Sequence, residues 1–389
     1  MMAAPANTTW FCLEPIDSWS FGDGRPNHAG EDQSDLACLF PPSPLTVAGA
    51  IRAAAARALG WSGRPAEPWP KDIVERLGDG LDAGPLRFTG PFLARDGEPL
   101  FPAPAHLVGT VDAGGEWQPA DLLAPGTEVM TDLSEAPVGL PEPCGVAKSM
   151  VSSSLKPPRG VWLTVQGLSR VLAGELPPSQ ECVRERDLFS FEHRVGLELE
   201  ADSRTAREAH LYSPVHVRLK RNVGIVVGVA GLDAAIQLPE LIPLGGEGRL
   251  AACRVMSEPP LPTAVSKSPG AALSCLVALT PVRLLNAARD AWDVPRPGDT
   301  ASRLVAGLDG RIVSLCIERP LRLGGWDSVQ RRPLPLTPHA RAGTVWFLSG
   351  GPPEPTTTQR VGDLTEFGFG HLVAGYVPPV ALNPHQRAP

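Results

Sequence analysis

Cysteine is scarce in this sequence, and long apolar runs are missing from it. The seven cysteines among 389 residues are odd in number and widely spaced, and none belongs to a Cys-x-x-Cys pair. This spacing predicts neither a disulfide framework nor a zinc finger, and it fits a reducing cytosol. No stretch approaches the roughly 18 consecutive apolar residues that span a bilayer, and no basic segment leads into an apolar run at the N-terminus. We therefore expect a cytoplasmic protein without membrane contact.

The motifs of several enzyme classes are also missing. The sequence has no His-Glu-x-x-His of a metalloprotease, no Gly-x-Ser-x-Gly of a serine hydrolase and no Gly-x-Gly-x-x-Gly nucleotide fingerprint. Gly370 and Gly375 have the spacing of a phosphate-binding loop, but Tyr376 occupies the position of its required lysine. Acidic residues between positions 14 and 35 could hold a divalent cation, although a solvated loop explains them better. We expect neither a metal nor a cofactor.

Charge is divided unevenly along the chain, whose formal net charge is −7. Residues 1–205 contain 16 basic and 28 acidic residues, a net charge of −12, whereas residues 206–389 contain 19 and 14, a net charge of +5. This division allows the basic half to hold phosphates while the acidic half contacts protein. A simpler interpretation is that both halves merely keep the surface soluble.

The N-terminal part combines a strand, a long loop and a helix. Alternating polarity over residues 9–16 predicts a strand, and the following Gly-rich and Pro-rich segment 17–42 is long enough to be a functional loop. Ser43 as N-cap, Pro44 at the first helical position and an apolar stripe that ends at Gly60 predict a helix.

Proline and glycine recur after this helix, so only short strands are expected there. They are placed near residues 86–93 and 162–165. The segment 141–160 reads as a loop with exposed cations, among them Lys148 and Lys156. These lysines could close over a phosphate chain, or they could simply be solvated.

The second half is more regular. Alternation over residues 215–220 and the apolar run 223–230 predict a β-hairpin with Arg218 on its cationic face, and periodicity over 232–241 predicts a helix. Further strands are expected at 250–256, 272–279, 312–317 and 344–348. The mixture predicts an α+β fold, and two ferredoxin-like domains with long loop insertions would account for it. We divide them into residues 1–205 and 206–389.

Glycine turns and one tryptophan are candidate contacts for RNA. The glycines at 245–246 and 368–370 leave backbone N–H groups open to a phosphate or a base, although tight turning alone explains each of them. Trp326 follows two glycines and precedes Arg331 and Arg332. It could stack on a base while the arginines hold neighbouring phosphates, or it could be an ordinary core residue.

Several blocks of the sequence together resemble one family. They are residues 13–15, 20–26, 40–44, 47–52, 194–196, 204–206, 211–213, 244–249, 324–327, 342–347 and 368–370. In this serial order the blocks are similar to the Cmr subunit three family, which belongs to the Cas-five group of RAMP proteins in type III-B CRISPR effector complexes. The resemblance covers the chain almost from end to end.

The resemblance implies two ferredoxin-like (RRM-like) domains with a C-terminal glycine-rich loop. It also implies a place at the foot of an RNA-guided complex in antiviral defence. Such a subunit holds the repeat-derived 5′ tag of the crRNA, beside the large polymerase-type subunit and the first backbone subunit. It meets target RNA only indirectly. The family is not a nuclease, so the resemblance implies a non-catalytic subunit.

We predict that cations and glycine loops of both halves contact the crRNA. The predicted residues are Arg25, His28, Arg52, Lys148, Lys156, Arg194, Arg218, Gly245, Gly246, Arg249, Trp326, Arg331, Arg332, Gly368, Gly370 and His371. Two alternatives stay open. One is a metal-independent, repeat-cleaving RAMP endoribonuclease that uses His28 or His371 as a general base. The other is an architectural subunit that binds only protein.

Overall fold

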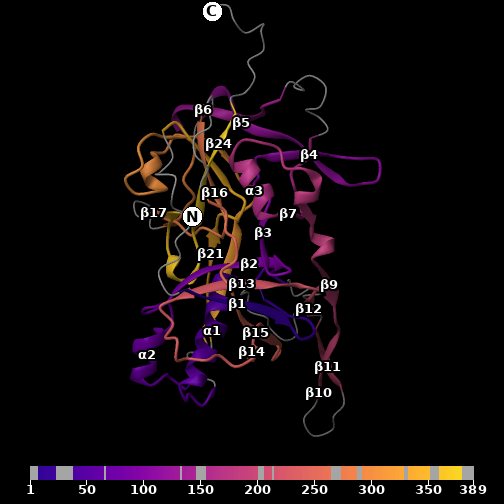
Figure 1. The fold of residues 1–389 in the computed structure, drawn as a ribbon, viewed down its shortest axis with the longest axis vertical. Helices are drawn as coiled ribbons and strands as arrows, with labels where there is room; N and C mark the ends of the chain where they lie inside the picture. Colours follow the sequence, from indigo (N-terminus) through magenta and orange to yellow (C-terminus); the bar gives the residue numbers. More distant parts are fainter. Residues whose placement is uncertain are drawn as a thin grey trace, which may run out of the picture.

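The structure is a computed structural model that describes residues 8–22, 38–64, 67–131, 134–145, 155–199, 206–212, 214–263, 273–286, 291–327, 332–350 and 359–378. Within these ranges the chain forms many strands and three α-helices. It is a strand-rich α+β fold with several antiparallel sheets, which confirms the α+β part of the expected fold class (Figure 1). No helix in the described part of the chain is long and apolar enough to cross a membrane.

The elements follow one another in a strand-rich order. The helices are α1 (Pro44–Ala58), α2 (Lys71–Leu77) and α3 (Val165–Leu172), with 3-10 turns η2 (Ser179–Glu181), η3 (Glu185–Asp187), η4 (Ala301–Arg303) and η5 (Thr365–Phe367). The strands are β1 (Thr8–Pro15), β2 (Arg87–Arg95), β3 (Glu98–Pro102), β4 (Leu107–Val111), β5 (Trp117–Thr131), β6 (Ser134–Pro143), β7 (Val161–Leu163), β8 (Cys182–Arg184), β9 (Phe189–His193), β10 (Gly196–Leu199), β11 (Ala206–Tyr212), β12 (Val215–Leu219), β13 (Val223–Ala230), β14 (Leu241–Pro243), β15 (Leu250–Met256), β16 (Leu273–Ala278), β17 (Leu285–Asn286), β18 (Ala291–Trp292), β19 (Ile312–Cys316), β20 (Leu321–Asp327), β21 (Arg332–His339), β22 (Val345–Leu348), β23 (Gln359–Arg360) and β24 (His371–Val377).

An eight-stranded sheet contains strands from both predicted halves. Its order is β14-β15-β1-β13-β2-β3-β7-β8, and neighbouring strands are antiparallel. The strands β13, β14 and β15 follow residue 205 but pair around β1 and β2. The predicted division at 205/206 therefore falls between parts of one sheet.

A five-stranded sheet is built from the C-terminal strands alone, in the order β19-β22-β16-β24-β23. The two large sheets share an apolar cluster. Phe92 and Val226 of the first sheet pack there with Phe347 and Val373 of the second. This shared core holds the sheets together, because burial of apolar surface is the main stabilising term in folding.

Helix α1 confirms the helix that Ser43, Pro44 and the apolar stripe predict. Ser43 is its N-cap and accepts a hydrogen bond from the N–H of Thr46, while Pro44 occupies the first turn. The buried stripe that includes Val47 and Ile51 packs against one face of the eight-stranded sheet. Capping and apolar spacing are local signals, so the sequence alone was sufficient here.

The predicted hairpin between residues 215 and 230 is wrong in its pairing. Both strands exist, but β12 pairs with β9, whereas β13 pairs with β1 and β2. Every residue of β13 is buried, as expected of a continuous apolar run that needs a partner on each side. Asn222, at a φ of 61°, turns the chain from one sheet into the other.

The predicted helix over residues 232–241 does not form. Asp233 instead organises a turn, because its side chain and its carbonyl accept the N–H groups of Ala235 and Ile236. Pro239 follows and has no N–H for a continuing helix. The apolar spacing was read correctly, since Leu232 and Ile236 are buried, but it anchors a loop.

One strand before residue 160 is longer than expected, and an arm follows later in the chain. β5 spans 15 residues and pairs with both β4 and β6. The chain from β9 to β12 forms an arm, with β10 and β11 farther out, which extends from the large sheet (Figure 1). The root of this arm carries the site described next.

Candidate nucleic-acid interface

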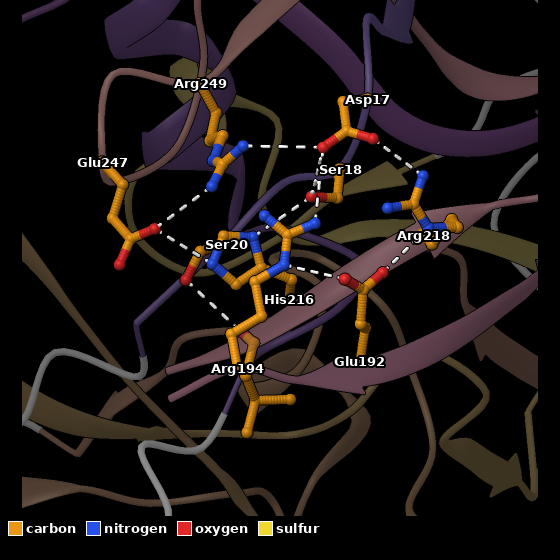
Figure 2. A network of polar contacts seen from close by, with 10 residues as sticks. Asp17, Ser18, Ser20, Glu192, Arg194, His216, Arg218, Glu247 and Arg249 are labelled. Atoms are coloured by element: carbon orange, nitrogen blue, oxygen red, sulfur yellow. Dashed lines mark hydrogen bonds and ion pairs between the residues drawn. The ribbon is translucent and has the colours of Figure 1, made fainter. Parts of the chain in front are cut away.

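Three of the predicted RNA-binding arginines meet at the root of the arm (Figure 2). Arg194 follows β9, Arg218 lies in β12, and Arg249 lies in the turn between β14 and β15. The chain after β1 reaches the same point, because Trp19 and Val217 exchange backbone hydrogen bonds of 3.0 and 2.7 Å. Segments more than 170 residues apart in the sequence are thus joined here.

Four side chains form a closed ring of ion pairs, which we call the charge ring: Asp17, Glu192, Arg194 and Arg218. The Nε atoms of Arg194 and Arg218 donate to the two oxygens of Glu192, at 2.8 Å each. Arg218 Nη1 donates to Asp17 Oδ1 at 2.8 Å, and Arg194 Nη2 donates to Asp17 Oδ2 at 3.4 Å. Each carboxylate therefore bridges both guanidinium groups.

The charge ring stays ionised at neutral pH. Hydrogen bonds from Arg218 and Arg194 hold the pKa values of Asp17 and Glu192 below their ordinary range. The bonds to Glu192 in turn raise the pKa values of Arg194 and Arg218. The two positive and two negative charges of the charge ring balance. The ring therefore does not attract an anion strongly at long range.

Each guanidinium of the ring has one terminal nitrogen that these four hydrogen bonds do not use. Arg194 Nη1 and Arg218 Nη2 have no hydrogen-bond partner among the residues that the structure describes. The Arg194 and Arg218 side chains are 29% and 43% exposed. Oriented arginine N–H groups at a partly exposed surface suit a phosphate oxygen.

A third carboxylate, Glu247, extends the network inward. Arg249 Nη1 lies 3.6 Å from Asp17 Oδ2, and Arg249 Nη2 lies 3.5 Å from Glu247 Oε2. The buried His216 places Nε2 at 2.9 Å from Glu247 Oε2 and Nδ1 at 3.2 Å from Ser18 Oγ. Burial lowers the pKa of His216, and the Glu247 carboxylate only partly opposes this shift. The imidazole of His216 is therefore neutral.

The glycine turn at 245–246 supports this network from behind. Gly245 has a φ of 87°, and a Cβ there would lie 2.6 Å from the Ser20 carbonyl oxygen. The N–H of Gly246 donates to that same carbonyl at 2.8 Å. Tight packing explains Gly245, whereas a Cβ on Gly246 would lie at an ordinary 3.6 Å from the same oxygen. The Gly246 N–H group is already used within the chain.

Arg52 is placed where it does not support the predicted RNA contact. Its side chain is buried at 6% exposure. Its guanidinium donates to the carbonyls of Leu77, Gly80 and Asp82 at 2.8, 2.9 and 3.0 Å. Arg52 therefore holds the loop after α2 instead of facing solvent.

The C-terminal glycine loop is also interior. A Cβ on Gly368 would lie 1.9 Å from the Gly90 carbonyl oxygen, and one on Gly370 would lie 1.9 Å from the Val361 carbonyl oxygen. His371 is 1% exposed, and burial lowers its pKa to about 3. These positions serve close packing, and His371 has no open path to a ribose hydroxyl as the endoribonuclease alternative requires.

Two of the remaining predicted residues face solvent in the β20–β21 hairpin. Trp326 is 61% exposed, and Arg332 is exposed on the paired strand. Lys156 is exposed beside β4. Arg25, His28, Lys148 and Arg331 lie outside the described residues.

Sequence reasoning missed the acidic members of the network and the role of His216. The sequence groups Asp17 only with the other acids between positions 14 and 35, and the alternation over residues 215–220 places His216 on the same face as Arg218. Alternation along β12 correctly grouped His216 with Arg218, but burial of that position depends on the distant Glu247 and Ser18. Among the described residues no cluster of three or more histidine, cysteine or acidic side chains is arranged to hold a metal ion.

Comparisons with solved structures find low-identity likenesses. A chain of a type III-B Cmr-β assembly bound to cognate target RNA is 16% identical, with a TM-score of 0.46, over 87% of this chain and 86% of that one. A chain of a Csm3-Csm4 subcomplex of a type III-A CRISPR-Cas interference complex is 10% identical, with a TM-score of 0.40, over 95% of this chain and 100% of that one. With TM-scores below 0.5, these likenesses carry no argument about function.

No curated protein matches the sequence. A family model does: the model described as CRISPR-associated protein (Cas_Cmr3) matches residues 11–377, nearly the whole chain. This match confirms the resemblance that the serial sequence blocks indicated. The chain belongs to the Cas_Cmr3 family of CRISPR-associated proteins.

Proposed function

We propose that this chain is a non-catalytic subunit of a type III-B CRISPR effector complex, where it binds the repeat-derived 5′ tag of the crRNA and docks the large polymerase-type subunit. The family membership supports the general role. The observation that carries the RNA-binding part is the charge ring, which presents two arginines with free N–H groups at the root of the arm.

A phosphate can join the charge ring without unfolding it. The carboxylates hold Arg194 and Arg218 in fixed orientations, so little side-chain entropy is lost when a phosphate oxygen approaches the free nitrogens. Exposed ion pairs are weak, so a phosphate can also replace Asp17 or Glu192 at one nitrogen of a guanidinium group. The ring therefore acts as a preorganised phosphate contact.

Trp326 supplies a second, different contact in this proposal. It is exposed in a hairpin that also exposes Arg332. An exposed indole can stack on a splayed base, and the neighbouring arginine can hold the adjoining phosphate. The tag would then be bound by phosphate contacts at the ring and by base stacking at the hairpin.

Strand order supports two RRM-like domains beneath these contacts. In the large sheet, the strands β15-β1-β13-β2 have the order 4-1-3-2 when numbered along the chain, with α1 between the first and second. In the second sheet, β24-β16-β22-β19 repeat the same order. This is the antiparallel arrangement of a split βαβ fold. It supports a division between residues 256 and 273 in place of 205/206.

Protein contacts belong to the acidic part of the chain in this proposal. Residues 1–205 have a net charge of −12, so away from local groups of cations such as Arg194 this part disfavours RNA and is left for the polymerase-type and backbone subunits. Target RNA would be met only through the crRNA. No role as a nuclease is proposed, since the described histidine of the alternative, His371, is buried.

The test is removal of both ring arginines. The double variant Arg194→Ala with Arg218→Ala should weaken binding of a 5′-tag RNA at least roughly tenfold, because a hydrogen bond to a charged group contributes about 1.5 kcal/mol or more. Fluorescence anisotropy with end-labelled RNA measures the change.

A matched control removes two arginines that are also exposed and ion-paired. Arg76 pairs with Asp233, and Arg170 pairs with Glu175. The variant Arg76→Ala with Arg170→Ala should keep the affinity of the unmodified chain. Equal RNA affinity in the two double variants would overturn the role given to the charge ring.

A further inference from the structure

A second cationic surface lies apart from the charge ring, at the β4–β5 hairpin. A cleft of about 440 Å³ opens there, lined by Trp117, Lys156, Pro157, Arg159 and Arg184 among others. Its lining contains three cations and no carboxylate. The charge ring, in contrast, pairs every arginine with an acid.

The backbone holds the cationic segment of the cleft in place. Lys156 exchanges two backbone hydrogen bonds with Gly109, of 2.7 and 3.0 Å, and its carbonyl accepts the indole N–H of Trp117 at 3.2 Å. A turn follows, in which the N–H of Arg159 donates to the Pro157 carbonyl at 2.9 Å. The side chains of Lys156 and Arg159 are exposed, and neither has an ion pair with the described residues.

Arg184 forms the inner wall. Its side chain is 18% exposed, and its Nη2 donates to the Trp117 carbonyl at 3.0 Å and to Glu116 at 3.3 Å. The guanidinium lies 6.0 Å from the centre of the Trp117 ring. Glu116 is shared with Arg186, so one carboxylate serves two arginines.

The cleft itself presents cations only. Carboxylates lie around it: Asp112 and Glu116 both act on Arg184, and the Glu185 side chain lies beside Gly160 in the same turn. None of these carboxylates lines the cleft, and Lys156 and Arg159 make no ion pair with the described residues. An anion is therefore attracted here, and the unpaired Lys156 and Arg159 can reach it without first giving up a partner.

We infer that this cleft binds backbone phosphates of single-stranded RNA, at a site separate from the charge ring. The inference rests on the proposed function, since it extends the RNA contact to a second surface. Trp117 is only 6% exposed, so the cleft offers neither an aromatic platform for bases nor an open pocket for the apolar anchor of a protein partner. Contacts made by cations alone are independent of RNA sequence.

The test uses the full chain and end-labelled single-stranded RNAs of two unrelated sequences. The variant Lys156→Ala with Arg159→Ala should weaken binding of both RNAs severalfold and to the same degree. The slope of log affinity against log salt should become shallower by about 1.4, which is roughly 0.7 for each of two phosphate contacts on a single strand. The variant Arg64→Ala with Lys71→Ala removes the same two residue types, both exposed, near α2. It should leave affinity and slope unchanged.

The outcomes separate this inference from the proposed function. If the ring variant loses RNA while the cleft variant matches the Arg64/Lys71 control, the cleft inference is overturned and the ring proposal stands. The opposite pattern supports the cleft and overturns the ring. If the unmodified chain binds neither RNA, both proposals fall. Unchanged RNA affinity in the cleft variant, together with lost binding to a neighbouring subunit, would assign the cleft to an acidic protein surface and overturn the inference.

Discussion

Arg52 and Arg218 use the same functional group in opposite surroundings. Arg52 is buried beneath the loop after α2 and donates only to backbone carbonyls, whereas Arg218 is 43% exposed and donates to two carboxylates. Burial lowers the pKa of Arg52, while Glu192 raises the pKa of Arg218. Exposure, more than residue type, therefore separates a structural arginine from one that can meet RNA.

The same contrast holds for the ionisable groups around them. Interior histidines are kept neutral by burial, and the carboxylates of the arm root are kept charged by their arginines. Stability and binding are thus expected to depend on different groups, which can be changed separately.

The largest expected effect comes from pH. Burial lowers the pKa values of His106, His339 and His371 to about 4, 4 and 3, against about 6.5 in an unfolded chain. The unfolded state therefore binds more protons in this window, so the free energy of unfolding rises with pH. It should fall as the pH drops from 6.5 toward 4, by up to about 1.4 kcal/mol per pH unit for each histidine.

Urea unfolding at a series of pH values measures this effect. The pKa values of Asp17 and Glu192 are lowered, so their contribution is lost only at more acidic pH. The variant Asp17→Asn with Glu192→Gln should consequently keep the same pH dependence between 6.5 and 4.5. A flat stability profile in that window for the unmodified chain would contradict the neutral interior histidines.

The next effect separates the two arginines directly. Arg52→Ala removes a buried group and leaves three carbonyls without their donor, so the free energy of unfolding should fall by about 3 kcal/mol. Arg218→Ala should leave the unfolding midpoint nearly unchanged, because exposed ion pairs contribute little. Equal free energies of unfolding for the two variants would contradict the contrast between the buried Arg52 and the exposed Arg218.

The smallest expected effect concerns the carboxylates of the charge ring. Asp17→Asn with Glu192→Gln keeps the shape of the ring but frees its arginines, so affinity for single-stranded RNA should rise by roughly three- to tenfold at low salt. Anisotropy titrations at several salt concentrations measure the gain. Asp233→Asn, which frees the distant Arg76, is the control and should leave RNA affinity unchanged. Weaker RNA binding in the ring variant would mean that orientation by the carboxylates matters more than competition from them.

Local signals predicted several elements correctly. The N-cap and apolar stripe predicted α1, and alternation or continuous apolar character predicted β1, β13 and β15. The helix over 232–241 failed because the same apolar spacing also fits a loop anchored at two points. The β12–β13 pairing failed because a two-residue turn can join strands of different sheets.

The candidate site was predictable only in part. The cations Arg194, Arg218 and Arg249 were selected from the sequence, but their partners Asp17, Glu192 and Glu247 were not, since the members come from four separate segments. The sequence predicts Gly368 as part of an open RNA-binding loop. In the structure, the absence of a side chain allows the Gly90 carbonyl to approach closely. Glycine at a close approach and glycine at a binding loop look alike in one sequence.

The amino-acid sequence by itself determined the family, the strand-rich α+β character and the elements whose capping or periodicity acts over a few residues. Only the tertiary structure decided which strands pair, which arginines face solvent and which histidines are neutral. The physical reason is range: hydrogen bonding within a turn depends on near neighbours, whereas burial and charge depend on side chains that meet only when distant segments pack together.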